Sequence, residues 1–234
     1  MTLLEIRRAV RGLASKRHAA ALQRFFKTGP GQYGEGDIFL GIRVPRLRKL
    51  AGMLHAARSN DIERLLQSPA HEERMLALLV LCGRFSRGSP IEQRKIYRLY
   101  FRNTQFVNNW DLVDLSAPCI VGSFLEKKDK DPLIRLAESS NLWERRIAIM
   151  ATFHFIRNGK FSETFRIARL LLSDEEDLIH KASGWMLREV WKRRPCMAEK
   201  FLRRHYLCMP RTMLRYAIEK MPSAKRLKYL SGQY

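Results

Sequence analysis

Residues 61–81 decide the fold of this chain, and they read DIERLLQSPAHEERMLALLVL. A short apolar-periodic segment is followed by a polar turn and then by the apolar run Met75–Leu81, whose length and flanks are those of a helix. Nothing elsewhere in the chain alternates convincingly between apolar and polar residues with a period of two, as a half-buried strand would. The sequence therefore predicts an all-α protein.

The same plan recurs further along the chain, which indicates an internal repeat. Each copy has a short first helix, a polar turn and a longer apolar second helix, with a period of about 34–36 residues. Stacked helix pairs of this length are typical of HEAT-like and armadillo-like solenoids, in which each pair buries its apolar face only against its neighbours. The further copies are PLIRLAESSNLWERRIAIMAT (132–152), RIARLLLSDEEDLIHKASGWMLRE (166–189) and EKFLRRHYLCMPRTMLRYAIEK (199–220).

The only long stretch punctuated by glycine and proline is GPGQYGEGD at 29–37, which predicts a loop. The chain before it is too short to fold alone, so we expect a hinge or a binding loop and not a domain boundary. We predict a single domain over residues 1–234, with an N-terminal helical pair at about 1–28 and repeats at about 38–228.

The charge balance indicates a polyanionic partner. The chain has 44 Lys and Arg against 23 Asp and Glu, a formal net charge of +21. An excess of this size repels itself in a compact protein unless a polyanion offsets it. Equivalent repeat positions lie side by side in a solenoid, so we expect a concave basic groove that binds double-stranded DNA. The second helices that would line this groove are predicted to open near Arg74, Trp110, Arg146, Lys181 and Arg215.

Cysteine and histidine usage favours neither a metal site nor a disulfide framework. Cys82, Cys119, Cys196 and Cys208 lack a C-x-x-C pair and lie in apolar stretches, as buried thiols in a reducing compartment do. No apolar run reaches the roughly 18 residues of a membrane span, and the N-terminus lacks a signal sequence. We expect a cytoplasmic, nucleoid-associated monomer that binds no membrane and uses neither a metal nor another cofactor.

The strongest local constellation is NNWDLVDLSAP at 108–118. If a helix begins there with Asn109 as its N-cap, Trp110 and Asp114 are separated by four residues and share one face. The alternative is that Trp110 belongs to the core and that Asp114 is a solvated helix residue.

Two further segments place aromatic and basic residues at similar repeat positions. In NLWERRIA (141–148), Arg145 and Arg146 precede the apolar part of a second helix, and solvated charges are the alternative. In HKASGWMLRE (180–189), Trp185 and Arg188 share a face, although Trp185 could also be a core residue. Gly184 costs helix stability, which makes most sense if another backbone or a ligand approaches closely there.

In order and spacing, FLGIRVPRLRKLA (39–51), NNWDLVDLSAP (108–118), LWERRIAIMAT (142–152) and HKASGWMLRE (180–189) resemble the AlkD-type DNA alkylation repair glycosylases. The resemblance covers roughly residues 35–220. It implies a HEAT-like solenoid that cradles duplex DNA. It also implies a monofunctional DNA-alkylpurine glycosylase, which hydrolyses the N-glycosidic bond of cationic lesions such as 3-methyladenine and 7-methylguanine.

The resemblance also implies which residues form the site. Trp110 and Asp114 match the tryptophan–aspartate pair of the family and are the expected catalytic residues. Where some family members carry glutamine, this chain has Arg43, and a cleft position that is lysine in some members falls on His154. The residues expected to contact DNA or substrate are Trp185, Arg146, Arg188, Arg43 and Lys181.

One carboxylate is enough for this chemistry. A purine alkylated at N3 or N7 is already cationic and departs as a neutral base, so the general acid of ordinary glycoside hydrolysis is unnecessary. Asp114 would stabilise the oxocarbenium-like sugar, and Trp110 and Trp185 would flank it. The resemblance further implies contacts to the sugar and backbone with little enclosure of the base, and an open groove offers no obvious deep pocket.

Other functions remain open at this stage. A non-catalytic HEAT-repeat scaffold that binds DNA explains the charge and the repeats equally well, but gives Asp114 no reason to lie in a basic groove. A solenoid that binds an acidic protein is the next alternative. RNA binding is a third, although the chain has no RRM, KH or OB signature.

Overall fold

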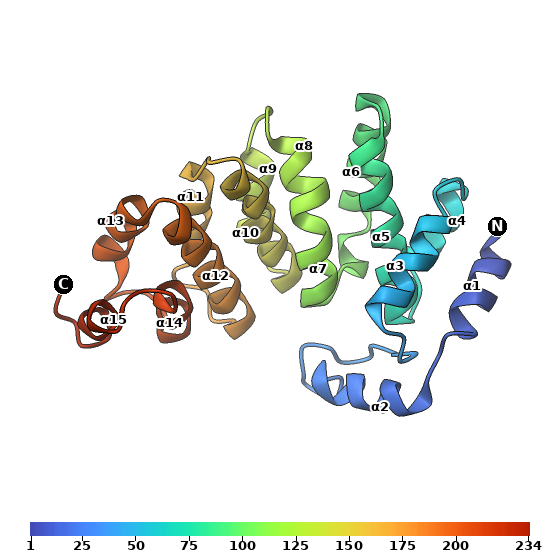
Figure 1. Cartoon of the computed structure of the whole chain (residues 1–234), viewed down its shortest axis with the longest axis horizontal. Helices are drawn as coiled ribbons and strands as arrows, with labels where there is room; N and C mark the ends of the chain where they lie inside the picture. The colour runs from blue at the N-terminus through green and yellow to red at the C-terminus, as the bar shows by residue number, and fades with distance from the viewer. The chain divides into compact units, whose positions relative to one another are not determined.

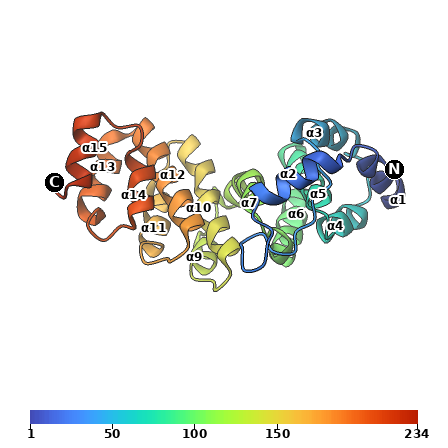
Figure 2. The same cartoon turned by 90° about the horizontal axis from the view of Figure 1, so that it is seen from below.

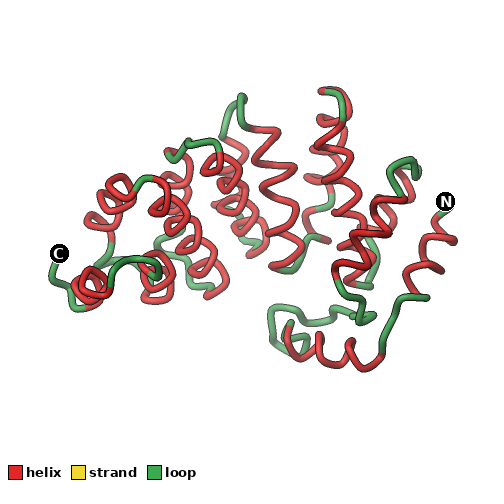
Figure 3. The backbone as a smooth tube through the Cα atoms, in the orientation of Figure 1, coloured by secondary structure: helices red, strands yellow, loops and turns green.

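The computed structural model describes all residues, 1–234, and is helical throughout (Figure 1, Figure 3). Its one extended pairing is an isolated bridge between Ile38 and Ala70. This confirms the all-α prediction. The chain divides into two compact units, Met1–Ile120 (unit 1) and Val121–Tyr234 (unit 2), and each is described by itself below. A single domain over the whole chain stays a prediction.

Unit 1 is built around α5, His71–Arg87. Every residue of α5 from His71 to Leu81 is buried, because α1, α3, α4, α6 and α7 all pack against it. A helix that is apolar all round is expected in such a central position. The other helices are α1 (Leu3–Arg11), α2 (Lys16–Phe25), α3 (Val44–Met53), α4 (Ser59–Leu66), α6 (Pro90–Arg102) and α7 (Trp110–Ser116), with a 3-10 turn at Thr104–Phe106.

Unit 2 contains the predicted repeat of helix pairs. The second helices α10 (Leu142–Arg157), α12 (Asp177–Arg193) and α14 (Arg211–Ile218) pack on one another in sequence, and Figure 2 shows them side by side. The first helices α9 (Asp131–Ala137), α11 (Ser162–Leu170) and α13 (Pro195–His205) form a second layer against them. A π-helical turn, Ala117–Gly122, leads into the unit, which also has α8 (Ser123–Leu125) and α15 (Ser223–Leu230).

The helix starts correct the register of the repeat. Three second helices begin at Leu142, Asp177 and Arg211, about one turn earlier than their predicted openings. Each first turn mixes polar residues with apolar ones, such as Leu142 and Ile179, so the sequence pattern did not mark where the helix begins. Arg146, Lys181 and Arg215 are therefore each the fifth residue of a helix. In α7 the fifth residue is Asp114, so Asp114 and not Trp110 occupies the equivalent position.

The close helix packing expected at Gly184 is present. A Cβ atom on Gly184 would lie 2.4 Å from the carbonyl oxygen of Met213 and 2.5 Å from Cβ of Tyr216, both on α14. It is therefore another backbone that approaches here, and the absence of a side chain lets α12 and α14 meet.

Two expectations about single residues and spans can be settled. Cys82 and Cys119 are half-buried, but Cys196 and Cys208 are exposed, so the expectation of four buried thiols is wrong for the latter two. Cys196 lies in the exposed first turn of α13, and Cys208 lies in the turn after that helix. None of the helices is long and apolar enough to cross a membrane.

Candidate active site

The start of α7 is fixed by a buried polar residue. Asn109 is fully buried, and its side-chain oxygen accepts the backbone N–H of Trp110 at 2.8 Å. Its amide nitrogen donates to Asp37 Oδ2 at 3.3 Å. The N-cap predicted at Asn109 is therefore confirmed. Because the helix begins at Trp110, this residue and Asp114 share a face, and both side chains are half-buried.

A buried ion network lies beneath this helix start. His71 Nδ1 lies 2.8 Å from Asp37 Oδ2, and His71 Nε2 lies 2.9 Å from Asp111 Oδ2. Ionised carboxylates only accept hydrogen bonds, so both ring nitrogens donate and the imidazole is protonated. Burial opposes that charge, but the hydrogen bonds and charges of Asp111 and Asp37 outweigh it and raise the pKa of His71 to about 9. Arg74 also pairs with Asp37, at 2.6 Å.

Sequence reasoning missed this network. His71 is separated from Asp37 and Asp111 by 34 and 40 residues, and no short motif links them. The only available signal was the run of three charged residues, Glu72, Glu73 and Arg74, after His71 at the start of an otherwise apolar helix.

Glu72 anchors the loop that faces α7. Its two carboxylate oxygens accept the backbone N–H groups of Leu40 at 2.8 Å, Gly41 at 2.7 Å and Ile42 at 3.0 Å. Gly41 has a positive φ of 79°, and a Cβ atom there would lie 2.2 Å from the carbonyl oxygen of Ser15. The loop is thus held by α5 on one side and by the start of α2 on the other.

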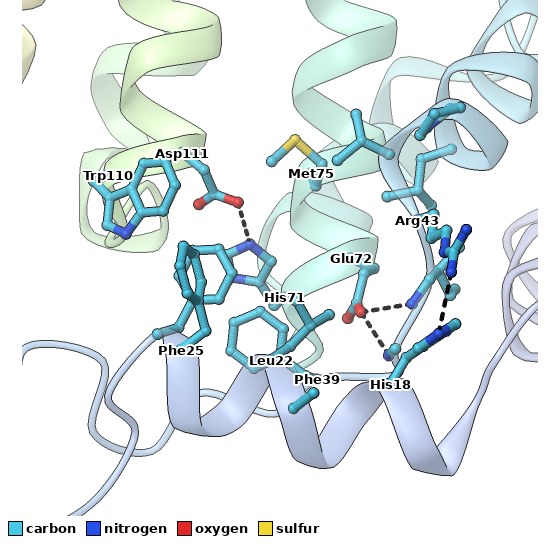
Figure 4. Close-up of a pocket in the computed structure, with 17 residues that line it drawn as sticks. His18, Leu22, Phe25, Phe39, Arg43, His71, Glu72, Met75, Trp110 and Asp111 are labelled. Atoms are coloured by element: carbon cyan, nitrogen blue, oxygen red, sulfur yellow. Dashed lines mark hydrogen bonds and ion pairs between the residues drawn. The ribbon is translucent and has the colours of Figure 1, made fainter.

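A cavity of about 660 Å³ lies between α2, α5, α7 and this loop (Figure 4). Trp110 forms one wall and stacks on Phe26, with ring centroids 5.1 Å apart and planes 18° apart. Phe26 in turn stacks on Phe39 at 4.8 Å. The repeat pattern did not predict this hollow, and little enclosure of the base stays a prediction. The loop and α2 enclose space that the repeat pattern alone does not reveal.

The two carboxylates of α7 have different surroundings. Asp111 lines the cavity, and its side chain is only 17% exposed and is bound by protonated His71. Asp114 lies one turn after Trp110 and belongs to neither the cavity lining nor the His71 network. Because Asp114 follows Trp110 by one helical turn, the two side chains can face a common substrate.

Arg43 belongs to the same cavity. It is the exposed N-cap residue of α3, and its guanidinium lies 3.4 Å from His18 Nε2 on α2. Figure 4 shows this contact at the end of the cavity away from Trp110. Unit 1 therefore places Trp110 and Arg43 in the lining of one hollow, whereas Asp114 lies one helical turn after Trp110 and outside that lining.

Arg146 is buried and not a solvated charge. It exposes only 5% of its surface, and its guanidinium donates to the carbonyl oxygen of Leu178 at 2.5 Å, at the start of α12. Its neighbour Arg145 pairs with Asp174 at 2.6 Å. Both arginines therefore connect one helix pair to the next, and little of Arg146 is left to face DNA.

The other predicted residues of unit 2 lie along α12 and α10. Lys181 pairs with Asp177 at 2.6 Å. Arg188 pairs with Glu219, the residue that caps the C-terminus of α14. The half-buried Trp185 ring lies between these positions, 5.9 Å from Phe153 on α10. Lys181, Trp185 and Arg188 have helical spacing and form one face of α12.

His154, the position that carries lysine in some family members, accepts or donates a hydrogen bond with Glu126 at 3.0 Å. Contacts from His154 and Lys160 lower the pKa of Glu126 to about 2. The imidazole is thus occupied by a partner of its own unit. A role for His154 towards DNA stays a prediction.

The predicted site residues fall into two groups. Trp110, Asp114 and Arg43 lie in unit 1, whereas Arg146, Lys181, Trp185 and Arg188 lie in unit 2. Their assembly into one cleft stays a prediction.

Comparisons with known proteins define the class of protein that this fold and site belong to. The family model described as DNA alkylation repair enzyme matches residues 6–221, and the chain belongs to that family. No curated protein sequence matches it.

Solved structures share the fold at low sequence identity. One is described as a predicted DNA alkylation repair enzyme from Enterococcus faecalis; it is 20% identical, with 90% of this chain and 97% of that chain covered and a TM-score of 0.69. Another is AlkD2 from Streptococcus mutans, 19% identical over 89% of this chain and 99% of that chain, with a TM-score of 0.54.

Proposed function

We propose that this protein is a monofunctional DNA glycosylase that hydrolyses the N-glycosidic bond of cationic alkylpurines, such as 3-methyladenine and 7-methylguanine, in duplex DNA. The proposal depends on one observation above all. Trp110 and Asp114 share a face of α7, whose start is fixed by buried Asn109, in a member of the DNA alkylation repair family.

The reaction needs a carboxylate and no acid. The bond between C1′ and the base nitrogen breaks, and the electron pair leaves with the base, which thereby becomes neutral. Water adds to the oxocarbenium-like sugar and loses a proton. Asp114 stabilises the cationic sugar through its charge and can position the water or accept its proton. Trp110 supplies an aromatic face to the same cation, a contribution of about 0.5–2 kcal/mol.

Asp114 is a better candidate for this role than Asp111. Protonated His71 bonds Asp111 directly and offsets its charge. A carboxylate already neutralised by a buried cation stabilises a second cation poorly. Asp111 therefore helps to hold α7 in place. We assign the catalytic role to Asp114 because it shares a face of α7 with Trp110.

Duplex DNA is the proposed partner because of the net charge of +21 and the DNA repair family. Lys181, Trp185 and Arg188 present one face of α12 to the backbone, and Arg43 contributes from α3. Arg146, being buried, supports this face from behind. We propose that the protein acts as a monomer on nucleoid DNA in the cytoplasm.

The test is release of 7-methylguanine from alkylated duplex DNA, without added metal, by wild type and by Asp114→Asn. We expect the substitution to lower excision more than tenfold and to leave duplex affinity unchanged or slightly higher, since an acidic group has been removed. Glu138→Gln, an exposed carboxylate at the end of α9, is the matched control and should excise like wild type.

Two results would oppose the proposal in different ways. Equal excision by Asp114→Asn and wild type would remove Asp114 from the mechanism. Tight duplex binding without base release by wild type would leave the non-catalytic DNA-binding scaffold as the function.

A further inference from the structure

Unit 2 has a hollow of its own, in addition to the cavity of unit 1. None of the residues proposed for base excision line it. It has a volume of about 430 Å³ and lies between α11 and α13. These are first helices, whereas Trp185 and its neighbours lie on α12, a second helix. Its lining includes Phe165, Arg166 and Arg169 from α11, and Lys200, Phe201 and Arg204 from α13.

The floor of this hollow is aromatic. Phe165 stacks on Phe201, with ring centroids 5.3 Å apart and planes 22° apart, and the His205 ring follows at 4.6 Å from Phe201. Phe201 is 8% exposed, whereas Phe165 and His205 are half-buried. The row of rings joins two helices, and Phe165 is partly exposed where it lines the hollow.

The rim of the hollow is basic and contains no acid. Arg166 and Arg169 stand on α11, and Lys200 and Arg204 stand on α13, all four exposed. Only Arg166 has a carboxylate within the 4.0 Å of an ion pair, that of Glu163 at 4.0 Å. Some other cations of this unit are paired: Lys192 and Arg193 with Glu189, and Lys225 with Glu199.

The positive charges of the hollow act on the neighbouring His205 side chain. Partial burial lowers the pKa of His205, and the positive charges of Arg169 and Arg204 lower it further. This direction is the one expected where positive charge accumulates without counter-charge.

We propose that the hollow between α11 and α13 is a second nucleic-acid-binding site that takes the phosphates of a DNA strand between its four cations. Guanidinium groups fork onto phosphate oxygens, and three of the four cations are arginines. The partly exposed Phe165 ring gives a sugar or base an aromatic surface to contact. An acidic protein segment would use the cations but would gain less from a flat aromatic floor.

This site would strengthen DNA binding without taking part in chemistry. A second contact turns part of the DNA encounter into an intramolecular event and raises the effective local concentration of DNA. The inference does not depend on base excision by Asp114. It would hold equally for a scaffold that only binds DNA.

The test compares two variants that each lose two positive charges from exposed positions of unit 2. The first variant is Arg169→Gln with Arg204→Gln, and it is called the cleft variant because both substitutions lie in the hollow between α11 and α13. The matched control is Lys127→Gln with Lys228→Gln, and both of its positions lie outside the hollow. Each full-length protein is titrated with undamaged duplex, with a single strand of the same length and with polyglutamate. The melting temperature of each variant verifies folding.

We expect the cleft variant to bind DNA about tenfold more weakly than the control at 100 mM salt, with a salt slope smaller by about two. Phe165→Leu keeps the charge and should weaken single-strand binding more than duplex binding if a base stacks there. A duplex-only effect would assign the contact to double-stranded DNA. Excision by the cleft variant at saturating alkylated DNA should equal that of the control.

Equal DNA affinities of the cleft and control variants would overturn the proposal. A cleft variant that loses polyglutamate binding as strongly as DNA binding would also overturn it, in favour of an acidic protein partner. Loss of excision by Asp114→Asn, or its absence, has no bearing on either comparison, because undamaged DNA is the ligand.

Discussion

At the scale of single residues, neighbouring charges decide what each carboxylate of α7 can do. Asp111 and Asp114 lie three positions apart on one short helix, yet only Asp111 is bound by the buried imidazolium of His71. That cation also binds Asp37, so one side chain joins the loop before α3 to the start of α7. The placement of Trp110 and Asp114 thus depends on the protonation of His71.

This dependence predicts a loss of stability at alkaline pH. The folded-state pKa of His71, about 9, is above the ordinary value of about 6.5. Its contribution, of order 3 kcal/mol, is therefore complete below about pH 6.5 and disappears as pH rises through about 9. Urea unfolding of wild type and His71→Gln between pH 6 and pH 10 measures it. The difference in unfolding free energy should shrink with rising pH; a constant difference would mean that the imidazole is not charged.

The sequence could predict site residues only where the signal is local. Asn109 was identified as an N-cap because capping depends on its immediate neighbours, and the Trp110–Asp114 pair follows from helical spacing. The ion network could not be predicted, because its partners come from distant segments that packing alone brings together. The burial of Arg146 was missed for the same reason: its acceptor, the carbonyl oxygen of Leu178, belongs to the next helix pair.

At the scale of helices, the periodicity of the sequence was enough to predict the repeat, but the exact helix starts were not predictable. The first turns of α10 and α12 mix polar and apolar residues, so the sequence pattern did not mark where either helix begins. The cavity beside Trp110 was also unpredictable. It exists because α2, none of whose residues is buried, lies across it.

Replacing two helical glycines by alanine should change the stability of the protein in opposite directions. Gly184→Ala places a methyl group against backbone and Cβ atoms at 2.4 and 2.5 Å, so α12 and α14 must separate, at a cost of about 1–3 kcal/mol. Gly83→Ala, in the middle of α5, meets only the flexible end of Arg87 at 3.5 Å and should gain up to about 1 kcal/mol from helix propensity. Thermal unfolding of both variants tests this. Equal melting temperatures would contradict the close contact at Gly184.

At the scale of the whole molecule, we expect charge to govern association with DNA. The net charge of +21 includes cations of both units that have no acidic partner, among them Lys200 and Arg204. Binding a polyanion releases the counterions condensed on it, and this release is weaker when salt is abundant. Affinity should therefore depend more on salt than on the sequence of the DNA.

This predicts a steep salt dependence for undamaged duplex of any sequence. If six to ten phosphates are contacted, the association constant should fall by about 10³ to 10⁵ between 50 and 200 mM salt. Fluorescence anisotropy of a labelled duplex measures the slope. Two duplexes of unrelated sequence should give the same value within error. A flat salt profile would show that the excess charge does not serve DNA binding.

The carboxylate of Glu72 grips the loop at residues 40–42 by its main chain alone. Leu40 can therefore be substituted without loss of its hydrogen bond to Glu72, because every residue except proline has the same backbone N–H group. Gly41 does not tolerate substitution in the same way, because its positive φ and its close neighbours exclude larger residues. In homologous proteins, we therefore expect the glycine and the glutamate to be conserved and the residue at position 40 to vary. The chemistry of the backbone would then decide which positions of this loop are conserved.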